Sequence, residues 1–274
     1  MNEKSPHLPV VLAIGGHDPG GGAGIQADIE SIGANGCHAA TALTCMTIQD
    51  SCDVRQLLPI APATLQEQIG VTLADCQVAV IKIGLLGSLA AAQAVVEMLH
   101  KYPQIPVVFD PVLAAGGGSA LAGKRLVDYI RQAVIPLCRL ITPNIPEAMQ
   151  LTHMQGGAEL DEMGHRLLTR GTDAVLITGT HDPDGGDEIT HRLYRADNPP
   201  LLSPWPRLRG EFHGSGCTLA SAIAARLARG ETLQTAVEQG LEYSWLALTH
   251  SFKTGKCQSI PGRLLRNPAQ HETR

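Results

Sequence analysis

Residues 9–28 read Pro9-Val-Val-Leu-Ala-Ile-Gly-Gly-His-Asp-Pro-Gly-Gly-Gly-Ala-Gly-Ile-Gln-Ala-Asp28. The first six are apolar and include β-branched side chains, which predicts a buried strand. Six glycines follow within residues 15–24, and the segment Ile25–Gly36 has the period of a helix. A strand, a glycine-rich turn and a helix in this order predict the opening of a parallel α/β sheet.

The same alternation continues along the chain. Further short, β-branched segments predict strands at Gln77–Ile83, Pro106–Asp110, Arg139–Thr142 and Ala174–Thr178. Segments of helical period lie at Ser88–Lys101, Lys124–Leu137 and Glu159–Arg170. Ile189–Leu201 predicts a hairpin or edge element, and two closing helices are predicted at Gly214–Arg229 and Leu233–Ser251. We therefore expect one domain over residues 1–274, with its core at about 9–252, folded as three αβα layers around a mostly parallel sheet.

Composition narrows the classes of function. Hydrophobic residues make up 44% of the 274 and aromatic residues only 3%, so the core must consist mainly of aliphatic side chains. Scarce aromatics and a net charge of −5 without a basic cluster disfavour nucleic-acid binding. The N-terminus lacks the apolar core of a signal peptide, and the longest uncharged, mainly apolar stretch, Ile83–Val96, is too short to span a bilayer. We expect a cytoplasmic protein without nucleic-acid or membrane partners.

The seven cysteines are scattered, and no two of them form a C-x-x-C pair. This spacing predicts neither a zinc site nor a disulfide framework. Six of the seven are interpreted as small hydrophobic residues, and only Cys217 lies in a motif that indicates chemistry.

The glycine-rich turn at residues 15–24 lets the backbone approach a ligand closely. It is neither a Walker A loop, since no Gly-Lys-Ser/Thr follows, nor a strict dinucleotide fingerprint, since Ala27 stands at the last glycine position. An ordinary strand-to-helix turn explains the glycines equally well. Asp28 favours a ligand, because an acid on the buried side of the first turn needs a partner and a ligand amino group would serve.

The second motif is Phe212-His-Gly-Ser-Gly-Cys-Thr218, which opens an alanine-rich helix. Gly214, Ser215 and Gly216 at a helix N-terminus present backbone N–H groups to an anion. A thiol on that first turn is expected to have a lowered pKa, so Cys217 could accept a proton from an attacking hydroxyl. The alternatives are a plain glycine-rich helix start and a Cys/His hydrolase that uses His213.

The third motif is Thr142-Pro-Asn-Ile-Pro-Glu147, directly after a predicted strand. Asn144 and Glu147 could hold a hydrated Mg²⁺ near phosphates, because this ion prefers oxygen ligands and keeps several waters. A helix cap explains the same spacing equally well. Asp110, at the end of another strand, is either a partner for the metal or a turn former before Pro111.

Together these motifs resemble the ribokinase-like superfamily and, more narrowly, the hydroxymethylpyrimidine and phosphomethylpyrimidine kinases of thiamine biosynthesis. The matching segments are 16–28, Gln49-Asp50, Lys82-Ile-Gly-Leu-Leu86, Asp110-Pro-Val112, Thr142–Glu147 and His213–Thr218. Cysteine at the end of the G-S-G-C sequence is the most specific feature, because most of the superfamily has aspartate there.

The resemblance implies a pyrimidine pocket lined by Gly16, Asp28, Gln49, Leu85 and Val112. Asp28 and Gln49 would pair with the ring amino group and a ring nitrogen. Family members use ATP and Mg²⁺ to phosphorylate 4-amino-5-hydroxymethyl-2-methylpyrimidine and then its monophosphate. They are typically cytosolic homodimers, and the resemblance leaves a need for a monovalent cation open.

The remaining site residues also follow from the resemblance. Gly214, Ser215 and Gly216 would form the anion hole, and Cys217 would be the base. The nucleotide and its metal would be bound by Asn144, Thr178, Gly179, Asp110 and Glu147.

The chain departs from the family pattern at several positions, namely His17, Gly20 and Leu85, and in the segment Thr178-Gly-Thr-His181. The family commonly has lysine where Thr178 stands, so another cation, Lys82 or Arg209, would have to compensate near the phosphates. A pyridoxal kinase is the nearest alternative enzyme. A pyrimidine sensor without catalytic activity is the alternative outside the enzymes.

Overall fold

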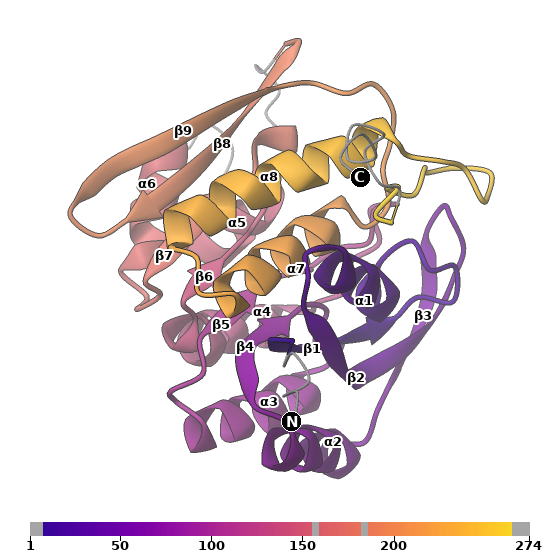
Figure 1. Cartoon of the computed structure of the whole chain (residues 1–274), viewed down its shortest axis with the longest axis vertical. Helices are drawn as coiled ribbons and strands as arrows, with labels where there is room; N and C mark the ends of the chain where they lie inside the picture. The colour runs from indigo at the N-terminus through magenta and orange to yellow at the C-terminus, as the bar shows by residue number, and fades with distance from the viewer. Residues whose placement is uncertain (1–7, 155–158, 182–185, 265–274) are drawn as a thin grey trace, which may run out of the picture.

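A single sheet organises the molecule (Figure 1). The computed structural model describes residues 8–154, 159–181 and 186–264. Within them nine strands lie in the order β3 (Val54–Pro59), β2 (His38–Gln49), β1 (Val10–His17), β4 (Val78–Ile83), β5 (Val107–Phe109), β6 (Leu140–Ile141), β7 (Ala174–Ile177), β8 (Glu188–Arg195) and β9 (Asn198–Pro206). Strands β2, β1 and β4 to β7 are parallel, whereas β3 and the β8–β9 hairpin are antiparallel additions at the two edges.

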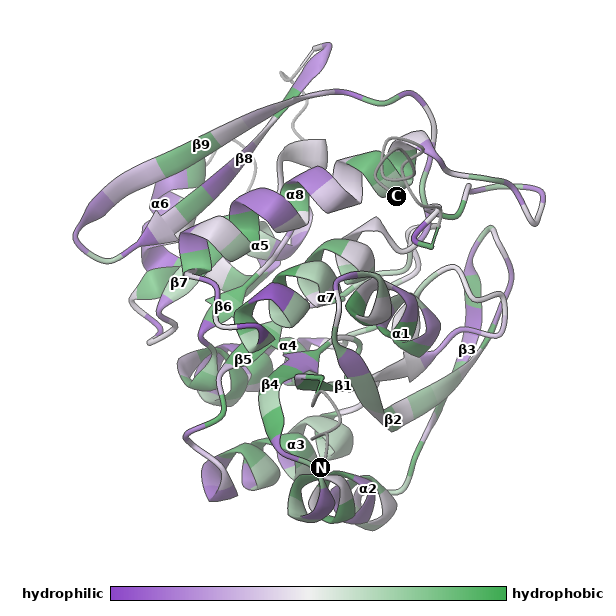
Figure 2. Ribbon diagram, viewed as in Figure 1, coloured by the Kyte–Doolittle hydropathy of each residue, from purple (hydrophilic) through white to green (hydrophobic). Residues whose placement is uncertain are grey.

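Helices cover both faces of the sheet, which confirms the predicted three-layer fold. One face carries α1 (Gly24–Ala34), α7 (Ser215–Ala228) and α8 (Leu233–Thr249), and the other carries α2 (Pro62–Asp75), α3 (Leu89–Lys101), α4 (Lys124–Tyr129), α5 (Ile145–Thr152) and α6 (Leu160–Leu168). Along β1 the side chains alternate between the two layers, because successive residues of a strand point to opposite faces. Val11 and Ala13 pack with the first group of helices, and Leu12 and Ile14 with the second. Figure 2 shows the apolar central strands between helices whose outer surfaces are hydrophilic.

The predicted elements are present with shifted ends. Residues 124–137 are helical throughout, but α4 is followed by a wider π turn at Ile130–Val134 and a 3-10 turn at Ile135–Leu137. Pro136, which has no backbone N–H to donate, lies in the last turn. The hairpin expected at 189–201 extends over β8 and β9. Sequence reasoning missed four elements, namely β2, β3, α2 and α5.

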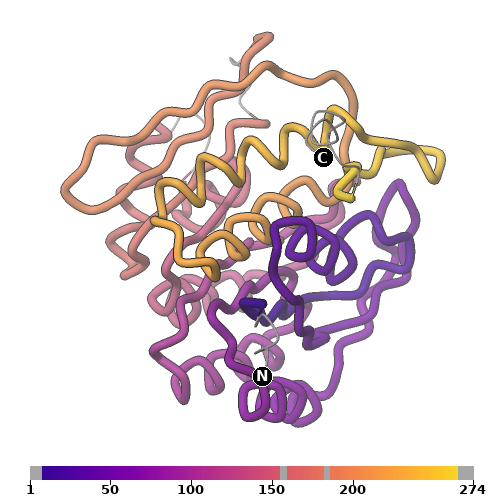
Figure 3. The backbone as a smooth tube through the Cα atoms, in the orientation of Figure 1, coloured from indigo at the N-terminus to yellow at the C-terminus, as the bar shows by residue number. Residues whose placement is uncertain are grey.

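The C-terminal segment returns to the glycine-rich loop after β1 (Figure 3). Gln258, Ile260 and Arg263 are each less than 9% exposed, although they lie beyond the expected end of the core at 252. Cys52, in the turn between β2 and β3, forms a disulfide with Cys257, 205 residues along the chain, with their Cα atoms 5.0 Å apart. The expectation of a chain without disulfides was therefore wrong, because residues far apart in sequence meet at this corner of the fold.

No helix among the described residues is both long and apolar enough to cross a membrane.

Candidate active site

A cavity of about 720 Å³ lies at the carboxyl ends of the parallel strands, where ligands bind in open α/β sheets. All but one of the predicted site residues line it, namely Gly16, Asp28, Gln49, Leu85, Asp110, Val112, Asn144, Glu147, Thr178, Gly214, Ser215, Gly216 and Cys217. Gly179 is the exception: it is buried, its N–H points to His191 Nδ1 at 3.4 Å, and a Cβ there would come within 2.2 Å of Thr190 O. Its role is close packing against β8 rather than contact with a ligand.

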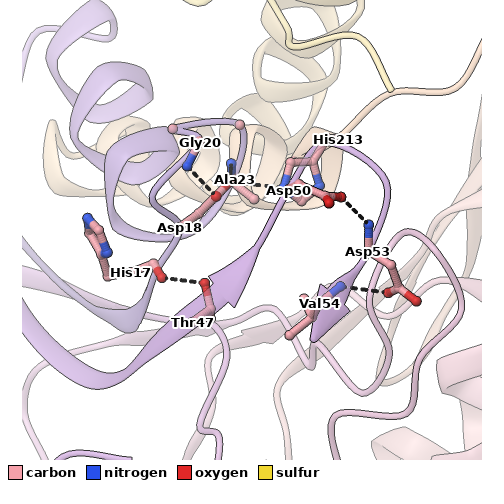
Figure 4. A network of polar contacts seen from close by, with 12 residues as sticks. His17, Asp18, Gly20, Ala23, Thr47, Asp50, Asp53, Val54 and His213 are labelled. Atoms are coloured by element: carbon pink, nitrogen blue, oxygen red, sulfur yellow. Dashed lines mark hydrogen bonds and ion pairs between the residues drawn. The ribbon is translucent and has the colours of Figure 1, made fainter. Parts of the chain in front are cut away.

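Asp18 fixes the glycine-rich loop (Figure 4). Its carboxylate accepts hydrogen bonds from the backbone N–H groups of Gly20 at 2.8 Å and Ala23 at 2.9 Å and from His213 Nε2 at 2.9 Å. Burial alone would raise the pKa of Asp18, but the hydrogen bonds from His213, Gln49 and the two backbone amides prevail and lower it to about 2. Sequence reasoning missed this residue, although an aspartate that starts a glycine-rich turn is typical of such side-chain-to-backbone bonds.

Asp28 has a protein partner, which corrects the idea that a ligand must satisfy it. Its Oδ1 accepts hydrogen bonds from Lys82 Nζ and from Ser221 Oγ, both at 2.7 Å. Burial would lower the pKa of Lys82, but Asp28, Cys217 and Asp110 raise it, so the ammonium stays charged. The second oxygen of Asp28 is buried and has no hydrogen-bond partner among the residues that the structure describes. One acceptor therefore remains for a ligand donor.

The residues of the predicted anion hole lie at the N-terminus of α7. Gly214 has φ 79°, and a Cβ there would lie 2.0 Å from Gly22 O, so only glycine fits this position. Ser215, Gly216 and Cys217 form the first turn of this 14-residue helix, where backbone N–H groups lack partners within the helix.

Arg263 ties this turn to the glycine-rich loop and was also missed in the sequence. Its side chain is fully buried, and Nε donates to Thr218 Oγ1 at 2.8 Å. Nη1 pairs with Glu30 Oε2 at 3.1 Å, and Nη2 donates to Gly22 O. The guanidinium therefore links the C-terminal segment, α1, α7 and the first loop.

Cys217 is not the low-pKa thiol that its helix position predicted. It is 8% exposed. Burial, together with Asp110 and Asp28, raises the pKa of the thiol to about 12 against the opposing effects of Lys82 and the Gly24 backbone. Burial raises the pKa of the neighbouring Asp110 to about 6, although Lys82 and the Cys217 thiol both favour its ionised form. Cys217 is therefore a neutral thiol beside a carboxylate to which it can donate.

Asn144 and Glu147 form a complete capping box at the start of α5. Asn144 Oδ1 accepts from Glu147 N, and Glu147 Oε2 accepts from Asn144 N, both at 2.9 Å. Burial and the nearby Asp110 raise the pKa of Glu147 to about 8. The alternative explanation of the motif, a helix cap, is confirmed.

The carboxylates of Asp110 and Glu147 fit a hydrated Mg²⁺. Asp110 disfavours the charge of Glu147, and Asp110 Oδ2 is buried with no hydrogen-bond partner in the described part of the chain. A divalent cation between them would relieve both conditions with oxygen ligands, while keeping waters. The described residues contain no group of three His, Cys, Asp or Glu side chains that could bind a metal by themselves.

The far end of the cavity lies beside β7 and β9. Thr178, Thr180, His181 and Arg207 line it, and Arg207 Nη1 donates to Thr180 O at 2.9 Å. The sequence left open whether Lys82 or Arg209 compensates for the missing lysine. Lys82 is committed to Asp28, and Arg209 is exposed and does not line the cavity. Arg207 supplies the cation at this end.

Comparison with known proteins gives one family by sequence and adds a pyridoxal kinase by structure. The family model described as phosphomethylpyrimidine kinase matches residues 18–261. The hydroxymethylpyrimidine/phosphomethylpyrimidine kinase of Haemophilus influenzae is 34% identical over 250 residues, which are 90% of this chain and 93% of the relative. A putative kinase of the same name from Schizosaccharomyces pombe is 34% identical over 93% of this chain, but the chain spans only about half, 50%, of that relative. The solved structure of Bacillus subtilis pyridoxal kinase, an ADP complex, is 27% identical with a TM-score of 0.85 and covers 93% of this chain and 97% of its own.

Proposed function

This chain belongs to the phosphomethylpyrimidine kinase family, and on that premise we propose that it phosphorylates 4-amino-5-hydroxymethyl-2-methylpyrimidine and then the monophosphate, using ATP, in thiamine biosynthesis. One observation carries the proposal. One cavity joins polar residues near the ends of β1, β2 and β4 to a helix N-terminus that can hold a phosphoryl group, and to residues that follow β7 and β9. The acceptor, the transferred group and the nucleotide can therefore lie in line.

The small end suits an aminopyrimidine. The free oxygen of Asp28 accepts a hydrogen bond from the exocyclic amino group, and the Gln49 amide donates to a ring nitrogen. Lys82 Nζ lies 2.7 Å from the other oxygen of Asp28, so the carboxylate that would accept this bond is paired with a cation. Leu85 and Val112 supply apolar contacts to the ring.

Transfer depends mainly on position and electrostatics. The backbone N–H groups of Gly214, Ser215 and Gly216 stabilise the charge on the transferring phosphoryl group. Mg²⁺, bound through Asp110 and Glu147, would neutralise nucleotide oxygens. As the substrate oxygen bonds to the γ-phosphorus, the bond from that phosphorus to the β,γ-bridging oxygen breaks, and ADP leaves with the electron pair. The substrate proton passes to Cys217 Sγ while the thiol gives its own proton to Asp110, so the thiol ends neutral and Asp110 ends protonated.

Two wider expectations belong to the same proposal. A cytoplasmic location suits an enzyme that uses ATP. A homodimer would cover Met46, Ile48 and Leu58, which are 46%, 46% and 37% exposed on the β2–β3 edge. Light scattering of the purified chain gives the mass and tests the dimer.

The decisive experiment measures ADP release from ATP and Mg²⁺ with the hydroxymethylpyrimidine, its monophosphate and pyridoxal offered separately. Turnover of both pyrimidines is the expected result. The similarity to a pyridoxal kinase structure makes pyridoxal the second candidate, and turnover of pyridoxal alone would move the substrate while keeping the mechanism. No turnover with any of the three would refute the kinase proposal and favour the sensor.

A further inference from the structure

Both tryptophans of the chain lie at one place in the cavity. The sequence contains only two, Trp205 and Trp245, in a protein with 3% aromatic residues. Trp205 belongs to β9 and Trp245 to α8, which lie side by side in Figure 1, and their ring centroids are 5.8 Å apart at 35°. Both line the cavity and are only partly buried. Two large aromatic faces are thus open to a ligand.

The sheet order places this pair away from the pyrimidine end. Asp28 lies in α1, directly after β1, and Gln49 is the last residue of β2. Strand β9 is the edge strand at the opposite side of the sheet, beyond β7 and β8. Arg207, two residues after Trp205, also lines the cavity and donates to Thr180 O. A nucleotide with its phosphates at Gly214–Cys217 therefore has its base directed toward the tryptophans.

One face of α8 lines the cavity around Trp245, and this part of the cavity is called the slot. Leu241, Ser244, Trp245 and Leu248 line the cavity and are spaced as neighbours on one side of a helix. Trp245 Nε1 donates to Pro206 O at 3.1 Å. Because the indole has a single donor, this bond fixes the ring and leaves Trp245 no hydrogen bond for a ligand. The tryptophan can then recognise only a ring face.

Ser244 is the polar group left in the slot. It is 7% exposed, and its Oγ is buried without a hydrogen-bond partner among the described residues. A hydroxyl both donates and accepts, so it can serve the amino edge of adenine and the keto edge of guanine.

We propose that Trp205, Trp245 and Ser244 form the nucleobase site, which holds a purine by stacking and does not strongly distinguish adenine from guanine. The inference rests on the proposed kinase function for the identity of the ligand as a nucleotide. It goes beyond that function in assigning the residues that hold the base and the breadth of the phosphoryl donor. Strong discrimination needs a site built around several fixed hydrogen bonds, whereas the described α8 residues that line the slot offer one polar side chain without a partner, Ser244.

Tryptophan fluorescence tests the site directly, because excitation at the red edge, where tyrosine does not absorb, gives a signal from these two residues only. We expect ADP and GDP to quench the full-length protein at concentrations within about tenfold of each other, and inorganic pyrophosphate to bind without quenching. Trp205→Leu and Trp245→Leu should each raise the KM for ATP by about 5- to 150-fold, the range for loss of one stacked base. The kcat and the KM for the pyrimidine should stay unchanged, and Trp→Phe at either position should restore most of the affinity.

Leu202→Ala is the matched control, because Leu202 is on the same strand, 57% exposed and outside the cavity. Thermal unfolding identifies any leucine variant that fails to fold, in which case the phenylalanine variants decide. The inference is overturned if ADP leaves the fluorescence unchanged, if the folded variants keep the parental KM for ATP, or if GDP binds more than a hundredfold weaker than ADP. Binding of ADP is measured without any acceptor, so quenching by ADP together with no pyrimidine turnover would refute the substrate assignment and leave the nucleobase site standing.

Discussion

Replacing Cys217 with serine and with alanine separates two ways in which this residue can take the proton of the acceptor. A preformed thiolate base requires a low pKa, whereas burial and two carboxylates raise the pKa of this thiol from the ordinary 9.0 to about 12. That rise disfavours the thiolate by about 4 kcal/mol. At pH 7.5 only about 1 in 30,000 sites would hold it. A relay to Asp110 avoids this cost, because the sulfur gives up one proton as it takes another.

A serine hydroxyl can carry out the same relay, but alanine cannot. We expect Cys217→Ala to lower kcat by about 10²- to 10⁴-fold and Cys217→Ser by roughly tenfold. The kcat/KM should rise with pH through a limb at or below about pH 6, because Asp110 must be ionised to receive the proton and its pKa in the free protein is about 6. ADP release, measured from pH 5 to 9 with saturating ATP and Mg²⁺, gives both quantities.

Cys37→Ala is the control, since Cys37 is a buried cysteine on the far side of α7 that contacts Ala225 O and lies outside the cavity. An equally large loss of kcat in the serine and alanine variants would refute the relay and favour a thiolate as the base. An alanine variant with parental kcat would remove Cys217 from the chemistry altogether.

Three further predictions concern the residues that hold the site together. Lys82→Met should lower the free energy of unfolding in urea by about 3–5 kcal/mol, because it leaves the Asp28 carboxylate buried without its cation, and adding Asp28→Asn should recover part of the loss. Asp18→Asn should lower the free energy of unfolding by about 2 kcal/mol at pH 7. The pKa of Asp18 in the folded protein, about 2, lies below the ordinary 3.8, so its stabilisation is complete above about pH 4 and is lost toward pH 2. The free energies of unfolding of the variant and the parent in urea should therefore converge near pH 2. Replacing Cys52 and Cys257 with serine should lower the free energy of unfolding in urea, by up to about 5 kcal/mol in the chain-entropy view of a loop of this length. A reductant should lower it in the parent but not in the variant.

Local patterns accounted for most of the fold. The buried parallel strands are continuous apolar runs, which can be identified without knowing their neighbours. Strand β2 was missed because its side chains alternate between small, polar and exposed positions near the sheet edge, so it carries no such run. Helix α5 was missed for another reason: its first turn was interpreted only as a ligand motif, although Asn144 and Glu147 serve as its cap as well.

Long-range partners could not be predicted in the same way. Lys82 is 54 residues from Asp28, and Arg263 is 233 residues from Glu30. The pKa of Cys217 shows the same limit. Its position at a helix N-terminus is local and lowers the pKa, whereas its burial beside Asp110 is tertiary and raises it further than the helix can compensate.

The two glycine-rich loops require each other, and this changes what their glycines mean. A Cβ at Gly22 would lie 2.3 Å from His213 Cδ2, and a Cβ at Gly214 would lie 2.0 Å from Gly22 O. These glycines therefore make room for the opposite loop and not only for a ligand. Asp18 holds the same contact through His213. In the proposed reaction the first loop borders the acceptor and the second holds the transferred group. Their direct contact would then fix the distance between the two reacting parts before either ligand arrives, which is the main requirement of phosphoryl transfer.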